Sequence, residues 1–313
     1  MEAVGGRSRL ALRSHRASLL PDYVSVDRWN QRIGLCREAR FAHARLASFR
    51  VGCRILRSGV LNMARMWETP ARTIGGRWVR WSDAWAADST LATRVFNRVT
   101  IVRRVDPSSA AELVDRIVQF YSARPDGGEY LVNDPWGTLN LEPYGFSRWW
   151  SLPFMVRSPA VAPRPRAHCE IREARSKGEF GDFVRTLVVG FGLPDLAHVP
   201  TSQVMDERVL AGGAMRCWIG VLDGRPIGTS VAYISDGVVG VYLVSVVPTM
   251  RGRGFGEALT WQATLADRGP STLQASGLGR PVYERMGYVT ALECATWIKT
   301  DREAPGYFRA TGT

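Results

Sequence analysis

Lysine is almost absent from this chain of 313 residues: Lys177 and Lys299 are its only lysines, and every other basic residue is an arginine. Lysine and arginine together number 41 against 29 acidic residues, a formal net charge of +12. An excess carried so uniformly by arginine fits a bias in the coding DNA better than a surface built to bind phosphates. Zinc-finger spacing, a basic helix with a heptad tail and an interleaved aromatic platform are all missing, so nucleic-acid binding is not expected.

Long apolar runs are missing as well. A membrane-spanning helix needs about 18 consecutive apolar residues, whereas the longest run, 238–248, is interrupted by Ser245 and is typical of a buried strand. We therefore expect no membrane-spanning segment. With 45% hydrophobic and 22% charged residues the chain can form a packed core, and its length favours two domains.

Cysteine and histidine are few and scattered. The cysteines are odd in number and form no CxxC pair, and the N-terminus has no secretory apolar segment, so we expect a reduced, cytoplasmic location without disulfides. The histidines show no ligand spacing, so no metal is expected. These residues are Cys36, Cys53, Cys169, Cys217, Cys294, His15, His43, His168 and His198.

Most of the positive charge lies at one end. Residues 1–62 contain twelve arginines, no lysine and four acidic residues, a net charge of +8. This composition resembles an organellar transit peptide; alternatively, Met63 is the true start and the preceding residues are a translated leader. In both cases we expect residues 1–62 to be mostly disordered, with incidental charge as the default interpretation and contact with polyanions as the alternative.

The rest of the chain divides at a proline-rich stretch. Three prolines within residues 158–166 favour extended backbone, so we predict a linker there between a domain at 63–157 and a second domain at 167–313. In the first domain Asp106 and Pro107 begin a predicted helix that continues to Tyr121. A strand at 130–132, a short helix at 139–145 and a strand at 153–157 are expected to follow.

The second domain alternates strands and helices. Asp223-Gly224 and Asp236-Gly237 are strong signals for tight turns between antiparallel strands. We expect strands at 169–174, 215–222, 226–234, 238–247, 271–276 and 296–299, and helices at 179–189 and 202–210.

A glycine-rich turn joins the strand at 238–247 to a further helix. Gly252, Gly254 and Gly256 leave the backbone amides unobstructed where the helix dipole is most positive, which favours an anion such as a pyrophosphate. Arg251 and Arg253 add positive charge at its edge. Phe255, Ala258, Leu259 and Leu265 are expected to form the buried face of the helix.

Other glycine-loop functions fit less well. A Walker loop needs Gly-Lys-Ser/Thr, and no lysine follows. A dinucleotide fingerprint needs GxGxxG inside a βαβ unit, whereas here GxGxG follows antiparallel strands. RNA-contacting RGRG segments are disordered, but this one lies between a strand and a helix.

The residues after the glycine loop make the pattern specific. A strand is followed by Gly277-Leu278-Gly279 and by a short helix with Tyr283, four residues before Gly287-Tyr288. Together with 251–256 this resembles the acyl-CoA-binding core of the GCN5-related N-acetyltransferase (GNAT) superfamily over about residues 168–300. The resemblance implies an α/β (α+β) fold: a mixed, mostly antiparallel twisted sheet flanked by helices.

The resemblance also implies a site. Acetyl-CoA would be the co-substrate, with its pantetheine arm along the strand and its pyrophosphate on the loop. An amine would attack the thioester directly, a backbone amide near Val246 would polarise the carbonyl, and Tyr283 would protonate the departing thiolate; alternatively, Tyr283 only packs in the core. The implied binding residues are Val244, Ser245, Val246, Val247, Arg251, Gly252, Arg253, Gly254, Phe255, Gly256 and Glu257.

The general base stays open at this stage. Several relatives carry a glutamate on the strand that corresponds to 238–247, but this strand holds Gly240 and Tyr242 and no carboxylate. Glu170, Asp206 and Glu207 are candidates, and a water-mediated route is equally compatible.

Residues 63–157 look like a degenerate second unit of the same family. Gly145-Phe146 echoes Gly287-Tyr288, but no glycine-rich loop lies between Val132 and Leu139, so CoA binding is not expected there. This half would cover the sheet edge or wall the acceptor cleft, or its tryptophans would simply fill a small core. The tryptophans in question are Trp81, Trp85, Trp136, Trp149 and Trp150.

We therefore predict an acetyl-CoA-dependent N-acetyltransferase that modifies a primary amine of a small molecule or protein. The alternative is a catalytically inactive acyl-CoA sensor. The sequence predicts a monomer or homodimer and does not identify the acceptor.

Overall fold

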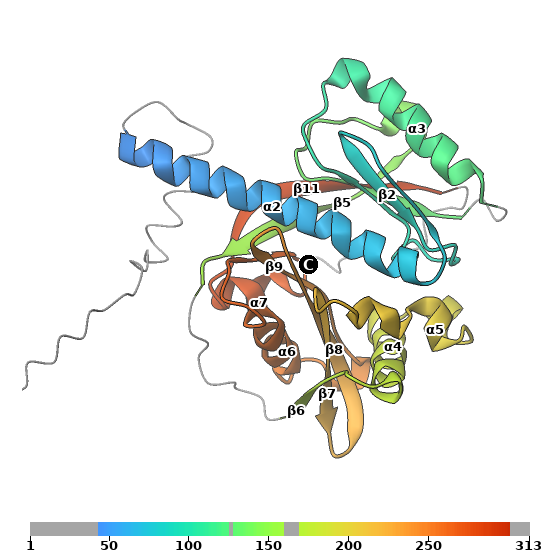
Figure 1. Ribbon diagram of the computed structural model, residues 1–313, viewed down its shortest axis with the longest axis vertical. Coiled ribbons are helices and arrows are strands. Elements are labelled where there is room, and N and C mark those ends of the chain that lie inside the picture. Colours follow the sequence, from blue (N-terminus) through green and yellow to red (C-terminus); the bar gives the residue numbers. More distant parts are fainter. Residues whose placement is uncertain (1–42, 125–127, 160–168, 301–313) are drawn as a thin grey trace, which may run out of the picture.

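The computed structural model describes residues 43–124, 128–159 and 169–300, with side chains from residue 52 onward. One sheet of eleven strands forms the centre of the molecule, in the order β1-β2-β3-β4-β11-β5-β10-β9-β8-β7-β6 (Figure 1). The strands are β1 (Arg77–Arg80), β2 (Ala84–Asp88), β3 (Arg98–Ile101), β4 (Tyr130–Asp134), β5 (Ser147–Arg157), β6 (Glu170–Glu173), β7 (Met215–Leu222), β8 (Arg225–Ser235), β9 (Val238–Val246), β10 (Ser271–Gln274) and β11 (Val289–Lys299).

The sheet is mixed and mostly antiparallel, as the sequence predicted. Only the pairs β3/β4 and β9/β10 are parallel among the pairs of described strands. The helices are α2 (His43–Thr73), α3 (Ala110–Ser122), α4 (Lys177–Phe191), α5 (Thr201–Val204), α6 (Phe255–Thr264) and α7 (Arg280–Arg285).

Helices cover both faces of the sheet. On β5, Phe154 belongs to the core that α2 and α4 close, whereas its neighbour Met155 belongs to the core beneath α6. Side chains alternate along a strand, so these two cores lie on opposite faces. The core beneath α3, around Leu113, is on the α6 side, because it includes Ala295 of β11, a neighbour of Cys294 in the α2 core.

The two halves of the chain exchange their last strands. β5, which precedes the predicted linker, pairs with β10 and β11 of the second half, and β11 pairs in turn with β4 and β5 (Figure 1). Most of the predicted linker, residues 160–166, lies outside the described residues. A boundary there remains a prediction for the chain, but the hydrogen-bonded sheet runs across it without a break.

The halves also repeat one order of elements. The series β1, β2, β3, α3, β4, β5 corresponds to β7, β8, β9, α6, β10, β11, and exchanging the two series reverses the sheet order, with only β6 left over. Such a repeat is what a duplicated unit would produce. The assignment of residues 63–157 as a degenerate acetyltransferase unit remains a prediction.

The expectation of disorder in residues 1–62 is wrong for its last part, because residues 43–62 belong to α2. Leu56, Val60, Met63 and Trp67 recur at helical spacing and are buried against the sheet, while Arg54 lies exposed on another side. The sequence analysis inferred disorder from the high arginine content of residues 1–62 and did not identify this apolar stripe. Residues 1–42 lie outside the described part of the chain.

Three further expectations are confirmed or corrected locally. Asp106 caps the turn before α3 by accepting a hydrogen bond from the Ser108 amide at 2.9 Å, as predicted. The helix predicted at 202–210 is wrong: it is α5 and a separate 3-10 turn (Glu207–Leu210), because Asp206 caps the second turn. Leu265 is 46% exposed beyond the end of α6, and Trp261 is buried in its place.

Candidate functional site

Strands β9 and β10 separate after a short parallel contact. Their register consists of the pairs Ser271↔Val239 and Thr272↔Gly240. Beyond Gly240, β9 continues to Val246 along β8, while β10 continues along β5. Beyond Gly240, the edge of β9 that faces β10 is not paired with it, and we call this V-shaped opening between the two strands the wedge. The predicted pantetheine residues 244–247 lie at its open end, in the last residues of β9 and directly after it.

A β-bulge shapes this part of β9. The register against β8 shifts between Thr229 and Val231, and Leu243 adopts a left-handed φ of 48°. The Thr229 hydroxyl holds the bulge, because Oγ1 donates to the Leu243 carbonyl at 2.9 Å and lies 2.8 Å from Ser245 Oγ. A bulge re-aims the main chain beyond it. The sequence does not reveal this one, since no glycine marks the left-handed position.

The glycine loop follows at the end of β9. Gly252 and Gly254 have φ angles of 76° and 83°, in the left-handed region, and Gly254 is the N-cap of α6. The first-turn amides of α6, at Phe255, Gly256 and Glu257, have no acceptor within the helix. A Cβ at Gly256 would meet only Val246 Cγ2 at 3.7 Å, so the loop adjoins the wedge. Such an arrangement suits an anion.

Arg251 is engaged with the main chain rather than standing free at the loop's edge. Its Nε donates to the Val246 carbonyl at 3.1 Å and its Nη2 to the Gly190 carbonyl at 2.9 Å. The side chain thereby ties the loop to the last turn of α4. Arg253 is exposed, with Nη1 3.0 Å from Met250 Sδ, and is the arginine that adds charge at the rim.

The tyrosine predicted as the acid lies on α7. Its ring lies against Gly279, where a Cβ would come within 2.7 Å of Tyr283 Cε2, and 6.1 Å from the ring of Tyr288. Burial, assisted by the neighbouring Tyr288 and opposed by a hydrogen bond with Thr260, raises the pKa of Tyr283 to about 12. The phenol is therefore protonated at neutral pH. It also packs against the α6 core, so both interpretations of Tyr283 stay compatible with its position.

The three carboxylates considered as bases have other partners. Glu170 lies on β6, three strands from β9, and pairs with Arg172 at 2.5 Å. Asp206 pairs with Arg208 at 2.8 Å, and Glu207 lies 3.9 Å from Lys177. Hydrogen bonds from their arginines lower the pKa of Glu170 and of Asp206. Nothing in these contacts directs any of the three toward the wedge.

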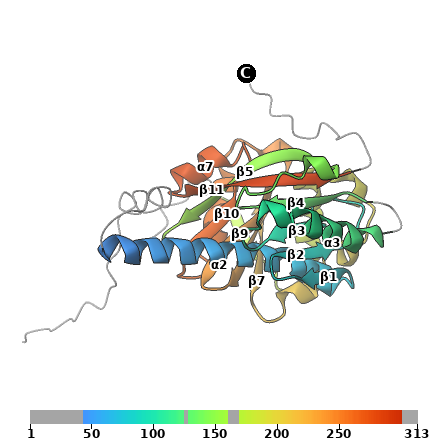
Figure 2. The same cartoon turned by 90° about the horizontal axis from the view of Figure 1, so that it is seen from above.

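Helix α2 covers the face of β9 at the start of the wedge (Figures 1 and 2). Asn62 donates Nδ2 to the Tyr233 carbonyl at 2.8 Å and accepts from Tyr242 Oη at 2.7 Å. Gly240 must be glycine, because a Cβ there would lie 2.0 Å from Asn62 Oδ1. Burial raises the pKa of Tyr242 well above its usual value. The sequence analysis did not predict this packing of α2 on β9, because it expected residues 1–62 to be mostly disordered.

The N-terminal half has different features at the corresponding points. β3 leads to α3 through Asp106 and Pro107, without a glycine between 102 and 109. The Trp136 indole donates to the Ile101 carbonyl at 3.0 Å, where β3 ends. The sequence analysis looked for a glycine loop at 132–139, after β4, whereas the counterpart of the glycine loop follows β3. In the turn after β4, Asp134 accepts hydrogen bonds from three backbone amides, those of Trp136, Thr138 and Leu139.

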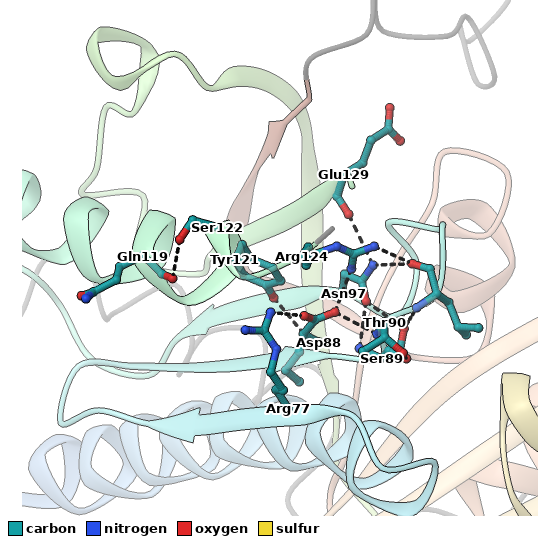
Figure 3. Close-up of polar contacts among 12 residues, drawn as sticks. Arg77, Asp88, Ser89, Thr90, Asn97, Gln119, Tyr121, Ser122, Arg124 and Glu129 are labelled. Atoms are coloured by element: carbon teal, nitrogen blue, oxygen red, sulfur yellow. Dashed lines mark hydrogen bonds and ion pairs between the residues drawn. The ribbon is translucent and has the colours of Figure 1, made fainter. Parts of the chain in front are cut away.

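The buried ion pair of Asp88 and Arg124, shown in Figure 3, has a structural role. Asp88 is fully buried and pairs with Arg124 at 2.7 Å and with Arg77 at 2.5 Å. Tyr121 donates to the Ala87 carbonyl at 2.8 Å beside it. Each group is engaged by another, so the cluster fastens α3 to β1 and β2.

The five named tryptophans of this half are engaged with neighbours. Trp81 packs edge-on against Phe120, Trp149 lies 4.8 Å from Trp150, and Trp85 lies beneath the Arg80 guanidinium. Their assignment to an acceptor wall remains a prediction. Trp67 of α2, which the sequence interpretation did not name, lies nearer the wedge, with its ring 6.4 Å from that of Tyr242.

Membrane-spanning helices and clustered metal ligands are both missing from the part of the chain that the structure describes. The helices there include none with the length and apolar character needed to cross a membrane. Histidine, cysteine and acidic side chains in that same part do not gather in groups of three that could hold a metal ion.

A model of the acetyltransferase (GNAT) family matches residues 193–288. A GCN5-related N-acetyltransferase from Kribbella flavida is similar with a TM-score of 0.54 and 16% identity, covering 76% of this chain and 96% of that one. A functionally unknown conserved protein from Staphylococcus epidermidis ATCC 12228 has a TM-score of 0.55 and 14% identity, covering 72% and 94%. No curated protein sequence matches.

At 14–16% identity these solved structures support the fold alone. The assignment to a family rests on the match of the family model to residues 193–288. The matched residues contain the wedge, the glycine loop and Tyr283. The second half of the chain therefore carries a domain of the acetyltransferase (GNAT) family.

Proposed function

We propose that this protein is an acetyl-CoA-dependent N-acetyltransferase that transfers an acetyl group to a primary amine. The observation that carries the proposal is the wedge between β9 and β10 leading directly to the Gly254-capped start of α6. The wedge offers unpaired main-chain groups to an extended arm, and the loop offers amides to a diphosphate. Family membership supports acetyl transfer in general, and the acceptor is a proposal of its own.

In this proposal the substrate thioester lies in the wedge. The amides of 252–257 hold the diphosphate and the backbone of 244–247 holds the pantetheine arm, so the acyl carbon lies near the bulge. A main-chain amide beyond Leu243 then donates to the carbonyl oxygen as negative charge develops there. Because the groups are fixed before reaction, this stabilisation needs little reorganisation.

The acceptor amine attacks the carbonyl carbon, and the bond to sulfur breaks. Tyr283 supplies the proton that the thiolate takes up, since its raised pKa keeps the phenol protonated throughout the neutral range. The amine loses its proton through water, because β9 carries Tyr242 where a carboxylate would be needed and Tyr242 keeps its own proton.

The loop is tested with Gly254→Glu in the full chain. The added carboxylate lies at the proposed diphosphate site, so acetyl-CoA affinity measured by calorimetry should fall below detection. Gly224→Glu is the matched control, because Gly224, like Gly254, is exposed and has a positive φ (75°) but lies in a remote turn. Equal affinity in the two variants contradicts the proposal.

The missing carboxylate on β9 keeps one other function in view, that of an acyl-CoA sensor without catalysis. Thiol release from acetyl-CoA with a panel of amines separates the two. Turnover that falls in Tyr283→Phe while binding persists supports the enzyme. Binding without turnover of any amine supports the sensor.

A further inference from the structure

The face of the central strands that α2 covers carries polar side chains from both halves of the chain. Val99, Val132, Leu273 and Ala295 belong to the cores on the α3 and α6 side. The alternate positions on β3, β4, β10 and β11 therefore face α2. These positions hold Arg98, Asn133, Gln274 and Cys294.

Two hydrogen-bond donors on this face lack an acceptor. Asn133 is fully buried and Trp67 is 6% exposed. Within the described residues, Asn133 Nδ2 and Trp67 Nε1 have no hydrogen-bond partner, and the Gln274 amide has the weak acceptor Cys294 Sγ. Native proteins pair nearly all buried polar atoms, so two unpartnered donors on one face are unusual.

Arg98 adds a cation to the same face. Its Nε donates to the Val95 carbonyl at 2.8 Å, and its guanidinium lies 4.2 Å from the centre of the Trp67 ring. No carboxylate of the described residues forms an ion pair with it. Arg98 is half-buried, and burial lowers its pKa to about 10. A partly desolvated guanidinium without a carboxylate partner is a favourable site for an incoming oxyanion.

These groups are contiguous. Arg98 and Cys294 interact electrostatically, and a hydrogen bond from the Gln274 side chain lowers the pKa of the Cys294 thiol against the larger effect of burial, which raises it. Thr296, two residues along β11, lies 3.4 Å from Asn133 Oδ1. The other end of the group reaches the wedge, because Trp67 packs against Tyr242. We call Trp67, Arg98, Asn133 and Gln274 the donor floor.

We propose that the donor floor binds a carboxylate or phosphate of the acceptor, so that the substrate is an amine bearing an oxyanion. This inference rests on the proposed function and names the substrate class. The unpartnered atoms of the floor are all donors, and a guanidinium fork matches the paired oxygens of a carboxylate or phosphate. A polyamine, by contrast, would bring positive charge to an unpaired Arg98 and would be disfavoured.

The first test uses pairs of amines that differ in the oxyanion: β-alanine against propylamine, and phosphoethanolamine against ethanolamine. Thiol release from acetyl-CoA is measured for the full chain, for Arg98→Met and Arg98→Lys, and for Arg225→Met, an exposed arginine whose loss removes the same charge. We expect the member of each pair that bears the oxyanion to be preferred at least about tenfold in kcat/KM. Arg98→Met should abolish that preference by raising the KM for this member while the KM for acetyl-CoA stays the same, and Arg98→Lys should restore part of it.

A second measurement needs no turnover. Thermal unfolding is followed with acetate and with inorganic phosphate, without acetyl-CoA, in the wild type and the same variants. We expect a rise in Tm that is lost in Arg98→Met and kept in Arg225→Met, and the more effective anion identifies the group. Equal use of both amines in a pair, a preference that survives Arg98→Met, or no Arg98-dependent rise with either anion overturns the inference. The unfolding measurement does not depend on the glycine loop, which Gly254→Glu tests separately, so a failure of this inference can be told from a failure of the proposed function.

Discussion

Removing the Arg251 side chain should weaken acetyl-CoA binding without any contact between that side chain and the ligand. Arg251 bridges the carbonyls of Val246 and Gly190 and thereby fixes the glycine loop against α4. A hydrogen bond from a charged group contributes about 1.5–3 kcal/mol when buried. Because Arg251 is exposed, we reduce the two bonds together to about 1.5 kcal/mol. Arg251→Met should then raise the Kd for acetyl-CoA roughly tenfold.

Two variants distinguish this positioning role from simple charge. Arg251→Lys keeps the charge but cannot bridge two carbonyls with a rigid fork, so calorimetry should show nearly the same loss as for Arg251→Met. Arg253→Met removes an equal charge, on an exposed side chain whose Nη1 contacts Met250 Sδ, and should raise the Kd about two- to threefold. A lysine variant that binds like the wild type, or equal losses at 251 and 253, refutes the reasoning.

Three other predictions concern the buried pair, the acid and the N-terminal half. Asp88→Asn should lower the free energy of unfolding by about 3 kcal/mol in urea titrations, because Arg124 stays buried beside it. Glu170→Gln removes an exposed ion pair and should change the free energy of unfolding far less, and equal effects of the two variants would contradict the assignment. Folding raises the pKa of Tyr283 from the unfolded value of about 10 to about 12, so its contribution to stability is present below pH 10 and is lost as the pH rises through 12. Unfolding measured between pH 10 and 12 should therefore show a smaller loss of stability for Tyr283→Phe than for the wild type. The kcat of Tyr283→Phe should fall about 10²-fold. Calorimetry on the full chain should give one acetyl-CoA per chain, and a second site that survives Gly254→Glu would show that residues 63–157 bind it as well.

The full chain is required for that stoichiometry. Residues 63–157 lack β11, which lies between β4 and β5 in the sheet. A fragment would leave both strands without their shared partner, so its failure to bind would have no bearing on the intact half.

Local features of the fold were predictable from the sequence. Asp223-Gly224 and Asp236-Gly237 are tight turns with positive φ at both residues, and β7, β8 and β9 follow as predicted. Gly252 and Gly254 adopt the left-handed backbone that the glycine pattern indicated. In each case the signal lies within a few residues, where turn chemistry alone decides the backbone.

Long-range features were not predictable. The exchange of β5 and β11 depends on pairing between strands that are more than a hundred residues apart, and the apolar residues of β5 would suit either half equally. The bulge at Leu243 depends on Thr229 and Ser245 meeting across two strands. Helix α2 can pack over β9 only because Gly240 has no Cβ. In the sequence, a glycine within a strand indicates a weakened strand and gives no sign of the helix that covers it.

The most direct measurement is a crystal structure of the full chain with acetyl-CoA bound. The account predicts the diphosphate within hydrogen-bonding distance of the amides at 252–257 and the thioester between β9 and β10, with Tyr283 facing the sulfur. A diphosphate lodged anywhere else on the molecule, or a thioester outside that opening, would contradict it.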